Sequence, residues 1–172
     1  FKGNSLYPNA AAVQDALSKL GVASWNGTTS LECVNYFFTI PSDKIEDGLN
    51  FWNSAIRFPL LDKRELKKVV ISEIQGNEVN PQRILYAANS KQMFPDAPWK
   101  MDTSGSVKVI SDTTVKQLKQ IKNQFYIPNN SALFVGGDVN PEEVYKLVNK
   151  IFGSWKKGKD PFAKGIFQFQ PF

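Results

Sequence analysis

Hydrophobic residues recur along the chain at spacings that predict mainly helices. Apolar positions three and four residues apart are typical of a helix with one buried face, and they occupy residues 9–20, 42–58, 61–77, 80–93, 112–125 and 140–152. Asn9, Ser42, Asn80 and Asn140 precede four of these stretches and are candidate N-caps. The stretch 94–106 between two helices predicts a long loop, and loops of this length in a compact domain tend to be functional or mobile.

Shorter apolar runs predict strands. Ala23–Thr28 and Cys33–Ile40 form a first pair, with Gly27–Ser30 as the connection between them. Phe37 breaks the alternation of the second run, which indicates a central strand covered on both faces. Further strand candidates are Ala132–Val135 and Ile166–Phe169. Few strands, several long helices and no βαβ rhythm predict an α+β fold, with helices packed on an antiparallel β-sheet.

The composition is that of a globular protein, with 42% hydrophobic and 22% charged residues in a chain of 172. We expect one domain over residues 1–153, incomplete at its N-terminus, and a connector over residues 154–172 that forms a last strand or a link to a following domain. No apolar run approaches the roughly 18 residues of a membrane span. No signal peptide is present, and the first residue is Phe1 instead of Met, so we expect a cut or processed piece of a soluble protein whose compartment is unknown.

Charge and residue counts exclude several kinds of site. The formal net charge of +5 is moderate, and no zinc-finger, helix-turn-helix or RNP-like motif accompanies it, so we expect no nucleic-acid partner. The single Cys33 excludes an internal disulfide and a cysteine-based zinc cluster. The sequence has no histidine, and therefore lacks the commonest zinc ligand and the commonest general base.

One carboxylate interrupts the apolar face of the helix predicted over Leu61–Asn77. Glu73 follows Val69 by four residues, so at 3.6 residues per turn it should point into the middle of that face. A buried carboxylate is costly unless it is paired with a cation, hydrogen-bonded or bound to a metal. The spacing therefore marks Glu73 either as part of a structural ion pair or as a metal ligand.

Four blocks of the sequence resemble the pitrilysin/insulinase family of zinc metallopeptidases: FKGNSLYPN, GVASWNGTTSLECVNYFF, VVISEIQGNEVNP and FYIPNNSALFVGGDVNPEEV. Their order and spacing match the N-terminal, catalytic-type domain of that family over about Phe1–Phe152. The resemblance implies the family's fold, a zinc cofactor and peptide substrates. In the family, a helix carrying the motif H-x-x-E-H precedes the block that resembles Phe1–Gly3; its histidines bind zinc and its glutamate activates water.

The resemblance also implies roles for particular residues. The third zinc ligand of the family corresponds to Glu73, whereas a supporting glutamate falls on Leu66, where this sequence departs from the pattern. Family members bind the peptide along an edge strand, which corresponds to Ala23–Thr28, with Asn26 as the matching contact. The substrate-binding candidates are Ala23, Ser24, Trp25, Asn26 and Gly27. An ordinary sheet edge is an equally good interpretation of this strand.

Glu78 and Arg83 flank the Glu73 helix and are candidate supporting groups, although solvated surface residues are the commoner case. Tyr126, Asn129 and Asn130 match a family block as well, but Asn after Pro is also ordinary loop chemistry.

No H-x-x-E-H motif occurs in the sequence, and a catalytic zinc needs about three protein ligands. We therefore expect this chain alone to bind no catalytic zinc and to be inactive. Two hypotheses follow. The chain is part of an active metalloendopeptidase, which the match at Phe1–Gly3 favours, or it is a naturally non-catalytic homologous domain that pairs with an active partner and encloses peptides, which Leu66 favours. Both imply a peptide ligand and homologous peptidase domains, in the same chain or in a partner subunit.

Overall fold

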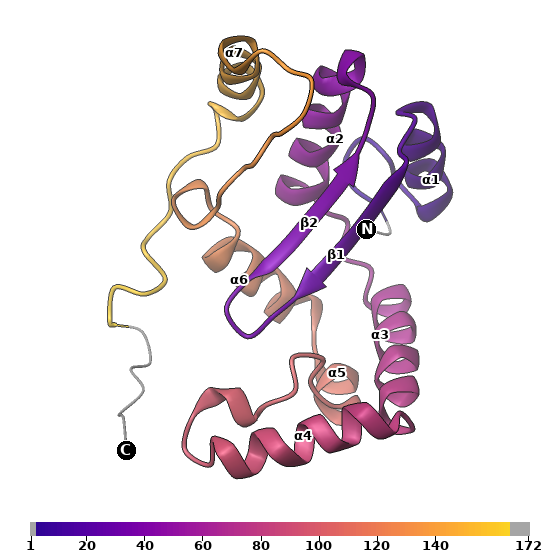
Figure 1. The fold of residues 1–172 in the computed structure, drawn as a ribbon, viewed down its shortest axis with the longest axis vertical. Helices are drawn as coiled ribbons and strands as arrows, with labels where there is room; N and C mark the ends of the chain where they lie inside the picture. Colours follow the sequence, from indigo (N-terminus) through magenta and orange to yellow (C-terminus); the bar gives the residue numbers. More distant parts are fainter. Residues whose placement is uncertain (1–2, 166–172) are drawn as a thin grey trace. The chain divides into compact units, whose positions relative to one another are not determined.

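The computed structural model describes residues 3–165, with the side chains of all but residues 63–66. The helices and strands follow the order α1 (Ala10–Lys19), β1 (Ser24–Thr29), β2 (Val34–Thr39), α2 (Ile45–Arg57), α3 (Lys63–Glu78), α4 (Pro81–Met93), α5 (Val107–Asp112), α6 (Val115–Phe125) and α7 (Pro141–Phe152) (Figure 1). Short 3₁₀ turns are η1 (Ser42–Lys44), η2 (Pro98–Lys100) and η3 (Pro128–Asn130). The predicted α+β class is confirmed: helices accompany a two-stranded antiparallel sheet of β1 and β2.

The described residues fall into two compact units. The first unit contains residues 3–26, 37–61 and 118–165, and the second contains residues 27–36 and 62–117. The boundary expected at residue 153 stays a prediction. The strand predicted at Ile166–Phe169 lies outside the described residues.

The core of the first unit forms between α1 and α2. Asn9 caps α1 as predicted, because its side-chain oxygen accepts a hydrogen bond from the backbone N–H of Ala12 at 2.9 Å. The buried members of this core are Val13, Ala16, Leu17, Leu20, Phe51 and Ala55. Phe51 sits at its centre, with the Tyr7 ring at 5.6 Å and the Phe38 ring at 6.0 Å between centroids. Aromatic packing of this kind is what fixes α2 in the unit.

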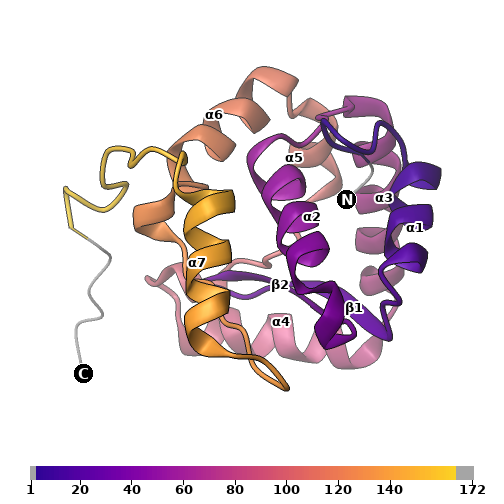
Figure 2. The same cartoon turned by 90° about the horizontal axis from the view of Figure 1, so that it is seen from above.

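Helix α2 also packs on α7, and the two lie side by side in Figure 2. Asn140 caps α7 as predicted, accepting hydrogen bonds from the N–H groups of Glu142 and Glu143. The ammonium of Lys150 on α7 lies 2.7 Å from a carboxylate oxygen of Glu46 on α2. This ion pair is exposed and therefore contributes little stability.

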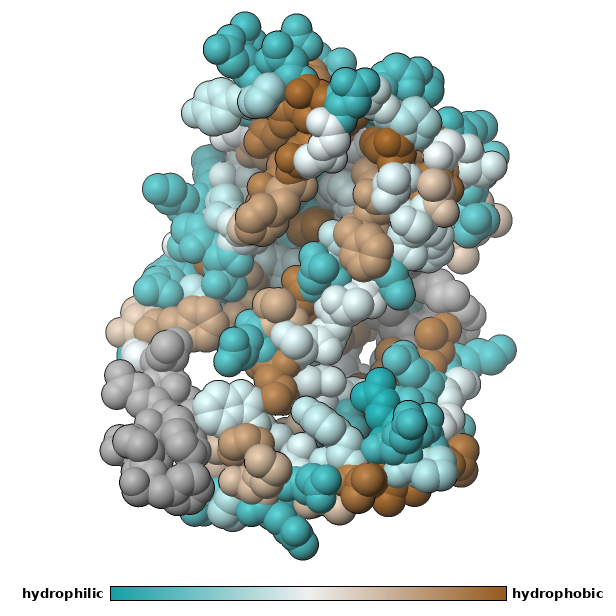
Figure 3. All heavy atoms as spheres, viewed as in Figure 1, coloured by the Kyte–Doolittle hydropathy of each residue, from teal (hydrophilic) through white to brown (hydrophobic). Residues whose placement is uncertain are grey.

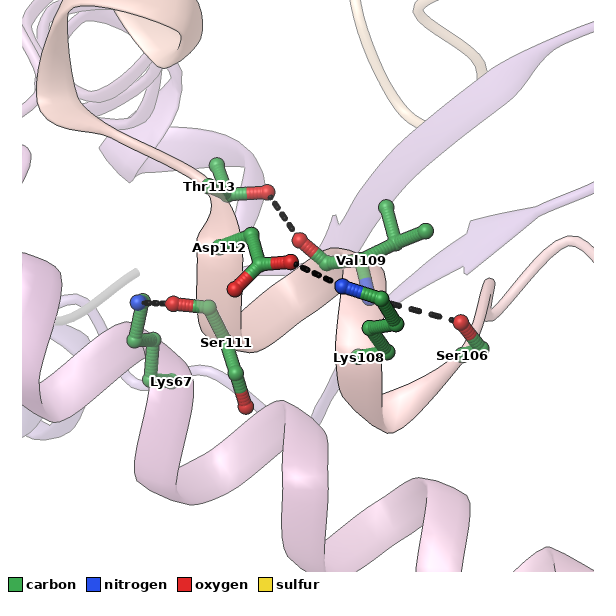
Figure 4. A network of polar contacts seen from close by, with 7 residues as sticks. All are labelled: Lys67, Ser106, Lys108, Val109, Ser111, Asp112 and Thr113. Carbon is green, nitrogen blue, oxygen red and sulfur yellow. Dashed lines mark hydrogen bonds and ion pairs between the residues drawn. The ribbon is translucent and has the colours of Figure 1, made fainter.

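The second unit is built around α3, which packs on α4 and α5. Asn80 caps α4 as predicted and accepts hydrogen bonds from the N–H groups of Gln82 and Arg83. Figure 4 shows the polar contacts on α5, where the ammonium of Lys67 on α3 donates to the backbone carbonyl of Ser111. Lys108 and Asp112 also form an ion pair at 2.8 Å along α5. The hydrogen bond from Lys67 connects α5 to α3, the helix that carries Glu73.

Several details of the sequence prediction are wrong. The first strand continues through Gly27 to Thr29, and the turn is Ser30–Cys33, where the N–H of Ser30 donates to the carbonyl of Cys33 at 2.9 Å. The predicted helix 112–125 is divided, since α5 ends at Asp112 and α6 starts at Val115. Thr114 causes the second start: its hydroxyl accepts from the N–H of Gln117, whose side chain accepts from Thr114 in return, as in a capping box.

The expectation of a covered central strand is also wrong for the described residues. Strand β2 pairs only with β1, and the side chains of Val34 and Phe37 are exposed. The predicted strand Ala132–Val135 pairs with no strand in the described part of the chain, and Phe134 is 90% exposed. Exposed apolar residues of this kind are visible as brown spheres among the teal ones in Figure 3.

Candidate functional site: a groove beside the Glu73 helix

A groove of about 910 Å³ opens in the second unit. The turn after β1, the last turn of α3, helix α4 and the loop 99–106 form its walls. Thr29 and Ser30 come from the β1 end, and Ile74 and Asn77 come from α3. A groove of this size accommodates several side chains of an extended peptide.

The lining combines apolar surface with balanced charge. Three acidic and three basic residues contribute: Glu32, Glu78, Asp102, Arg83, Lys91 and Lys100. Large apolar side chains accompany them, and Leu31, Tyr86 and Met101 are among those exposed to solvent. The groove therefore offers apolar contacts together with hydrogen-bonding groups of both charges, which suits a peptide better than a single charged metabolite.

Glu73 lies on α3 but is exposed, so the prediction of a buried carboxylate is wrong. The reason is the narrow buried side of α3. Ile74 is only 4% exposed, whereas Val69, one turn before Glu73, is 43% exposed. Because consecutive helix residues are about 100° apart, packing at Ile74 leaves Glu73 facing away from the core.

Helical geometry still relates Glu73 to the groove. Asn77 follows Glu73 by four residues and therefore lies on the same face of α3, one turn further along. Asn77 lines the groove, and Glu73 is not among its lining residues. Glu73 thus lies on the helix face that leads to the groove, with its carboxylate accessible to a ligand.

The predicted substrate-binding strand is an exposed sheet edge. All residues of β1 are exposed, and β2 pairs with it on one side only. Ala23 precedes β1, and its N–H donates to the carbonyl of Thr39 at 2.9 Å, while the Ser24 hydroxyl donates to the Thr39 hydroxyl at 3.2 Å. Trp25 is 46% exposed, and Asn26 is exposed as well.

Gly27 has a local packing role. A Cβ at this position would lie 3.0 Å from the ring of Tyr36 on β2, so the glycine leaves room for that aromatic ring. Gly27 is inside the strand, and the interpretation that it serves the turn is wrong.

Glu78 and Arg83, the candidate supporting groups, both line the groove. Thr29, Trp99 and Asp102 line it too and were not singled out by the sequence. Trp99 and Asp102 lie in the loop 94–106. The length of this loop predicted a functional segment but did not indicate which residues are involved. Tyr126, Asn129 and Asn130 are in the first unit and do not line the groove.

The residues present do not fit a catalytic zinc by themselves. Where side chains are described, no three His, Cys, Asp or Glu side chains come together as metal ligands. The sequence also has no histidine. Zinc sites that catalyse hydrolysis use about three protein ligands, so Glu73 can be at most one ligand of such a site.

In residues 3–165, no helix combines the length and the apolar character that crossing a membrane requires.

Family models match both parts of the sequence. Residues 1–106 match the model described as Insulinase (Peptidase family M16), and residues 112–171 match the one described as Peptidase M16 inactive domain. The chain is 30% identical over 149 residues to the uncharacterized zinc protease YmfH of Bacillus subtilis, a match that covers 85% of this chain and 33% of that protein. It is 26% identical over 135 residues to the zinc protease PqqE of Helicobacter pylori, covering 76% of this chain and 30% of that one.

Solved structures share the fold. A protease from Helicobacter pylori superposes with a TM-score of 0.85 at 22% identity, over 93% of this chain and 39% of that one. The first half of the periplasmic protease PqqL from Escherichia coli gives a TM-score of 0.82 at 17% identity, over 99% and 37%. The chain spans about a third of the length of the curated relatives it matches. With its first 106 residues matched by the family model, the chain belongs to the insulinase family of peptidases.

Proposed function

We propose that this chain forms the peptide-binding side of a zinc metalloendopeptidase and contributes one zinc ligand, Glu73, to a site completed by residues outside the chain. The zinc proteases among its relatives support the reaction class. The observation that carries the proposal is the groove, because the same groove is lined by the end of β1 and by the helix that bears Glu73.

Strand β1 would hold the peptide by strand addition. It is an edge strand with exposed side chains, and an extended peptide can pair with the backbone of such a strand. Within the second unit, a peptide paired with Gly27–Thr29 that continues past Thr29 reaches the groove, since Thr29 is both the last residue of β1 and part of the groove lining. Glu78 and Arg83 would then contact its polar groups.

The chain's own residues do not supply hydrolysis. They offer Glu73 and no histidine, so the peptide-binding role is separate from the chemical step. The 172-residue chain is therefore proposed to be inactive alone, with zinc bound only when further ligands are present.

A second candidate function is a non-catalytic homologous domain that encloses peptides beside an active partner. The match of residues 112–171 to the model described as an inactive domain favours it, as does Leu66 at a position where the family has a supporting glutamate. In this case the groove binds peptide but Glu73 has no metal to bind.

Peptide binding to the 172-residue chain tests the feature that both candidates share. Fluorescence anisotropy of labelled, extended peptides of varied sequence should show saturable binding. Peptides methylated on alternate backbone nitrogens should bind more weakly, because strand addition uses those N–H groups. Arg83→Ala should weaken binding by about threefold to tenfold, the effect of one lost polar contact. Lys146→Ala, an exposed lysine on α7, is the matched control.

Equal binding of methylated and unmethylated peptides, or no saturable binding, would contradict the proposal.

The coding sequence before Phe1 separates the two candidates. An intact H-x-x-E-H there supports the catalytic one, and a protein that contains it should lose zinc and peptidase activity on Glu73→Gln but not on Glu142→Gln, an exposed carboxylate of α7. A disrupted motif supports the non-catalytic one.

A further inference from the structure

The lining of the groove in the second unit includes a buried hydroxyl. Ser90 on α4 is only 7% exposed, and it is one of the groove-lining residues. Its backbone carbonyl accepts a hydrogen bond from the N–H of Phe94 at 3.0 Å, but its side chain has no hydrogen-bond partner among the described residues. Buried polar groups nearly always have a partner, so this exception needs a reason.

Other serines of the helices bond to a nearby carbonyl. Ser54, which is 2% exposed, donates to the carbonyl of Phe51 at 3.0 Å. Ser72 on α3 donates to the carbonyl of Lys68 at 2.9 Å. A carbonyl three or four residues earlier is the usual local acceptor for a serine within a helix. Ser90 forms no such bond with the described residues, so both its donor and its acceptor capacity remain available.

The Ser90 hydroxyl opens to the groove. In the part of the chain with described side chains, the only wholly enclosed side-chain nitrogen or oxygen without a hydrogen-bond partner is Nδ2 of Asn4. The unpaired oxygen of Ser90 is not such an atom, and it therefore keeps a small exposed area. Because Ser90 lines the groove and little of the residue is exposed, a ligand in the groove can reach this hydroxyl.

Small and aromatic residues surround Ser90 on α4. Residues three or four apart share a helix face, and both Ala87 and the 64% exposed Tyr86 precede Ser90 at this spacing and line the groove. Phe94 follows by four residues, and its ring centre lies 5.6 Å from that of Trp99. Trp99 also lines the groove and belongs to η2, which packs on α4. The hydroxyl thus lies between aromatic residues, and the small Ala87 leaves room beside it.

We infer that Ser90 determines specificity in the groove and, with Tyr86 and Trp99, forms a subsite for a tyrosine side chain of the bound peptide. The phenol ring would pack against the aromatic residues in a stacked or edge-to-face arrangement. Its O–H would form a hydrogen bond with the Ser90 hydroxyl, since each of these two groups can donate and accept. A phenylalanine side chain would fill the same space but leave the hydroxyl without a partner, which lowers its affinity.

This inference rests on the proposed function, because it names the side chain that the groove prefers in a bound peptide. The subsite can nevertheless be probed without strand addition, by nuclear magnetic resonance titration of the 172-residue chain with N-acetyl-tyrosine amide. The backbone amide signal of Ser90 and the indole signal of Trp99 should shift. N-acetyl-phenylalanine amide at the same concentrations should shift them less, since it lacks the phenol O–H.

Peptides that differ at one central position test the same preference in the full groove. Three labelled peptides carry Tyr, Phe or Gln there, and fluorescence anisotropy gives their affinities for the 172-residue chain. The Tyr peptide should bind about threefold to tenfold more tightly than the Phe peptide, the effect of one hydrogen bond. It should also bind more tightly than the Gln peptide, which can form the hydrogen bond but has no ring.

Variants assign the preference to the hydroxyl. Ser90→Ala removes no hydrogen bond from the folded chain, so it should fold normally and bind the Tyr peptide only as tightly as the Phe peptide. Tyr86→Ala, at an exposed position, should weaken both peptides equally, because both rings lose a contact. Ser72→Ala is the matched control, since Ser72 does not line the groove, and it should leave the ratio of the two affinities unchanged.

Equal affinity of the wild-type chain for the Tyr and Phe peptides would overturn the inference, and saturable binding of both would leave the proposed function standing. A preference for Tyr that persists in Ser90→Ala would also overturn it, as would a Gln peptide that binds as tightly as the Tyr peptide. The opposite failure is distinguishable: shifts with N-acetyl-tyrosine amide but no saturable peptide binding would support the subsite and contradict strand addition along β1.

Discussion

The side-chain amide of Asn129 forms two hydrogen bonds with the backbone of Gly158. Its oxygen accepts from the N–H of Gly158 at 2.9 Å, and its nitrogen donates to the carbonyl of the same residue at 3.3 Å. Gly158 also lies against Ile127, since a Cβ on the glycine would come 2.9 Å from Cγ2 of that side chain. Asn129 therefore links η3 to the segment after α7, which is a structural role; the match of this residue to a family block stays a prediction.

Asn129→Asp should destabilise the first unit by about 1–2 kcal/mol. The carboxylate keeps an acceptor for the Gly158 N–H but cannot donate to its carbonyl, which is then left facing a negative charge. Urea unfolding monitored by Trp fluorescence measures the change. Asn123→Asp, an exposed residue of α6, is the matched control for the added charge. An equal loss in both variants would show that net charge, and not the paired hydrogen bonds, is responsible.

Lys122 gives a pH-dependent prediction. Partial burial first and the charge of Arg57 second lower its pKa below the ordinary value of 10.5. In the unfolded chain Lys122 keeps its proton to higher pH, so between the lowered pKa and 10.5 the unfolded state binds more protons and stability rises with pH. At pH values below the lowered pKa, Lys122 is charged in both states, and the unfavourable environment of the charge lowers the free energy of unfolding by its full amount.

Lys122→Met should remove the destabilisation that the charged, partly buried lysine causes. The variant should unfold at higher urea concentration than wild type at neutral pH, and the difference should shrink as the pH approaches 10.5. Unfolding of both proteins at a series of pH values checks it, with Lys119→Met as control. A difference that stays constant across the series would mean that the methionine stabilises only by packing.

The sequence predicts three helix starts correctly because capping is local, whereas the prediction of Ser42 as an N-cap is wrong. Ser42 begins the 3₁₀ turn η1, and α2 starts at Ile45 after Lys44 without a side-chain cap. Asn9, Asn80 and Asn140 each accept hydrogen bonds from N–H groups two or three residues later. These bonds depend on neighbouring residues only, so the residue type and its place before an apolar pattern are sufficient. Thr114 shows the limit: its capping box with Gln117 was readable too, but the apolar pattern running through it favoured one continuous helix.

Burial is predicted less well because it depends on partners far away in the sequence. Periodicity placed Glu73 in the middle of an apolar face, yet the buried side of α3 is set by α4 and α5 and centres on Ile74. Likewise, Phe37 suggested a strand covered on both faces, whereas β2 has a single neighbour among the described residues. The groove joins four separate segments of sequence, and no spacing rule connects them.

Glu73→Gln should change the stability of the 172-residue chain by no more than about 0.5 kcal/mol, because the side chain is exposed. Thermal unfolding at neutral pH measures it, and Glu143→Gln on α7 is a matched exposed control. A loss above about 1 kcal/mol would indicate a structural ion pair, the alternative that the sequence left open. Near-neutral stability is expected both for an ordinary solvated carboxylate and for a ligand of a metal held from outside the chain, so it would exclude only the structural ion pair.

Phe134 leads to a prediction about self-association. It is 90% exposed, and the backbone of residues 132–136, drawn in orange between α6 and α7 in Figure 1, has no backbone hydrogen-bond partner in the described part of the protein. An apolar segment with free N–H and C=O groups can pair with the same segment of another molecule. We therefore expect the 172-residue chain to associate as its concentration rises.

Phe134→Lys should reduce this association, since a charge in the segment opposes both apolar contact and close approach of two like-charged strands. Static light scattering over a range of protein concentrations measures the apparent mass. Tyr145→Lys provides the control, because Tyr145 is a 69% exposed aromatic residue whose helix α7 already satisfies its backbone. If both substitutions reduce the apparent mass equally, exposed aromatic surface in general drives association. If wild type stays monomeric at the highest concentration, the free backbone of residues 132–136 is not sufficient to recruit a second copy.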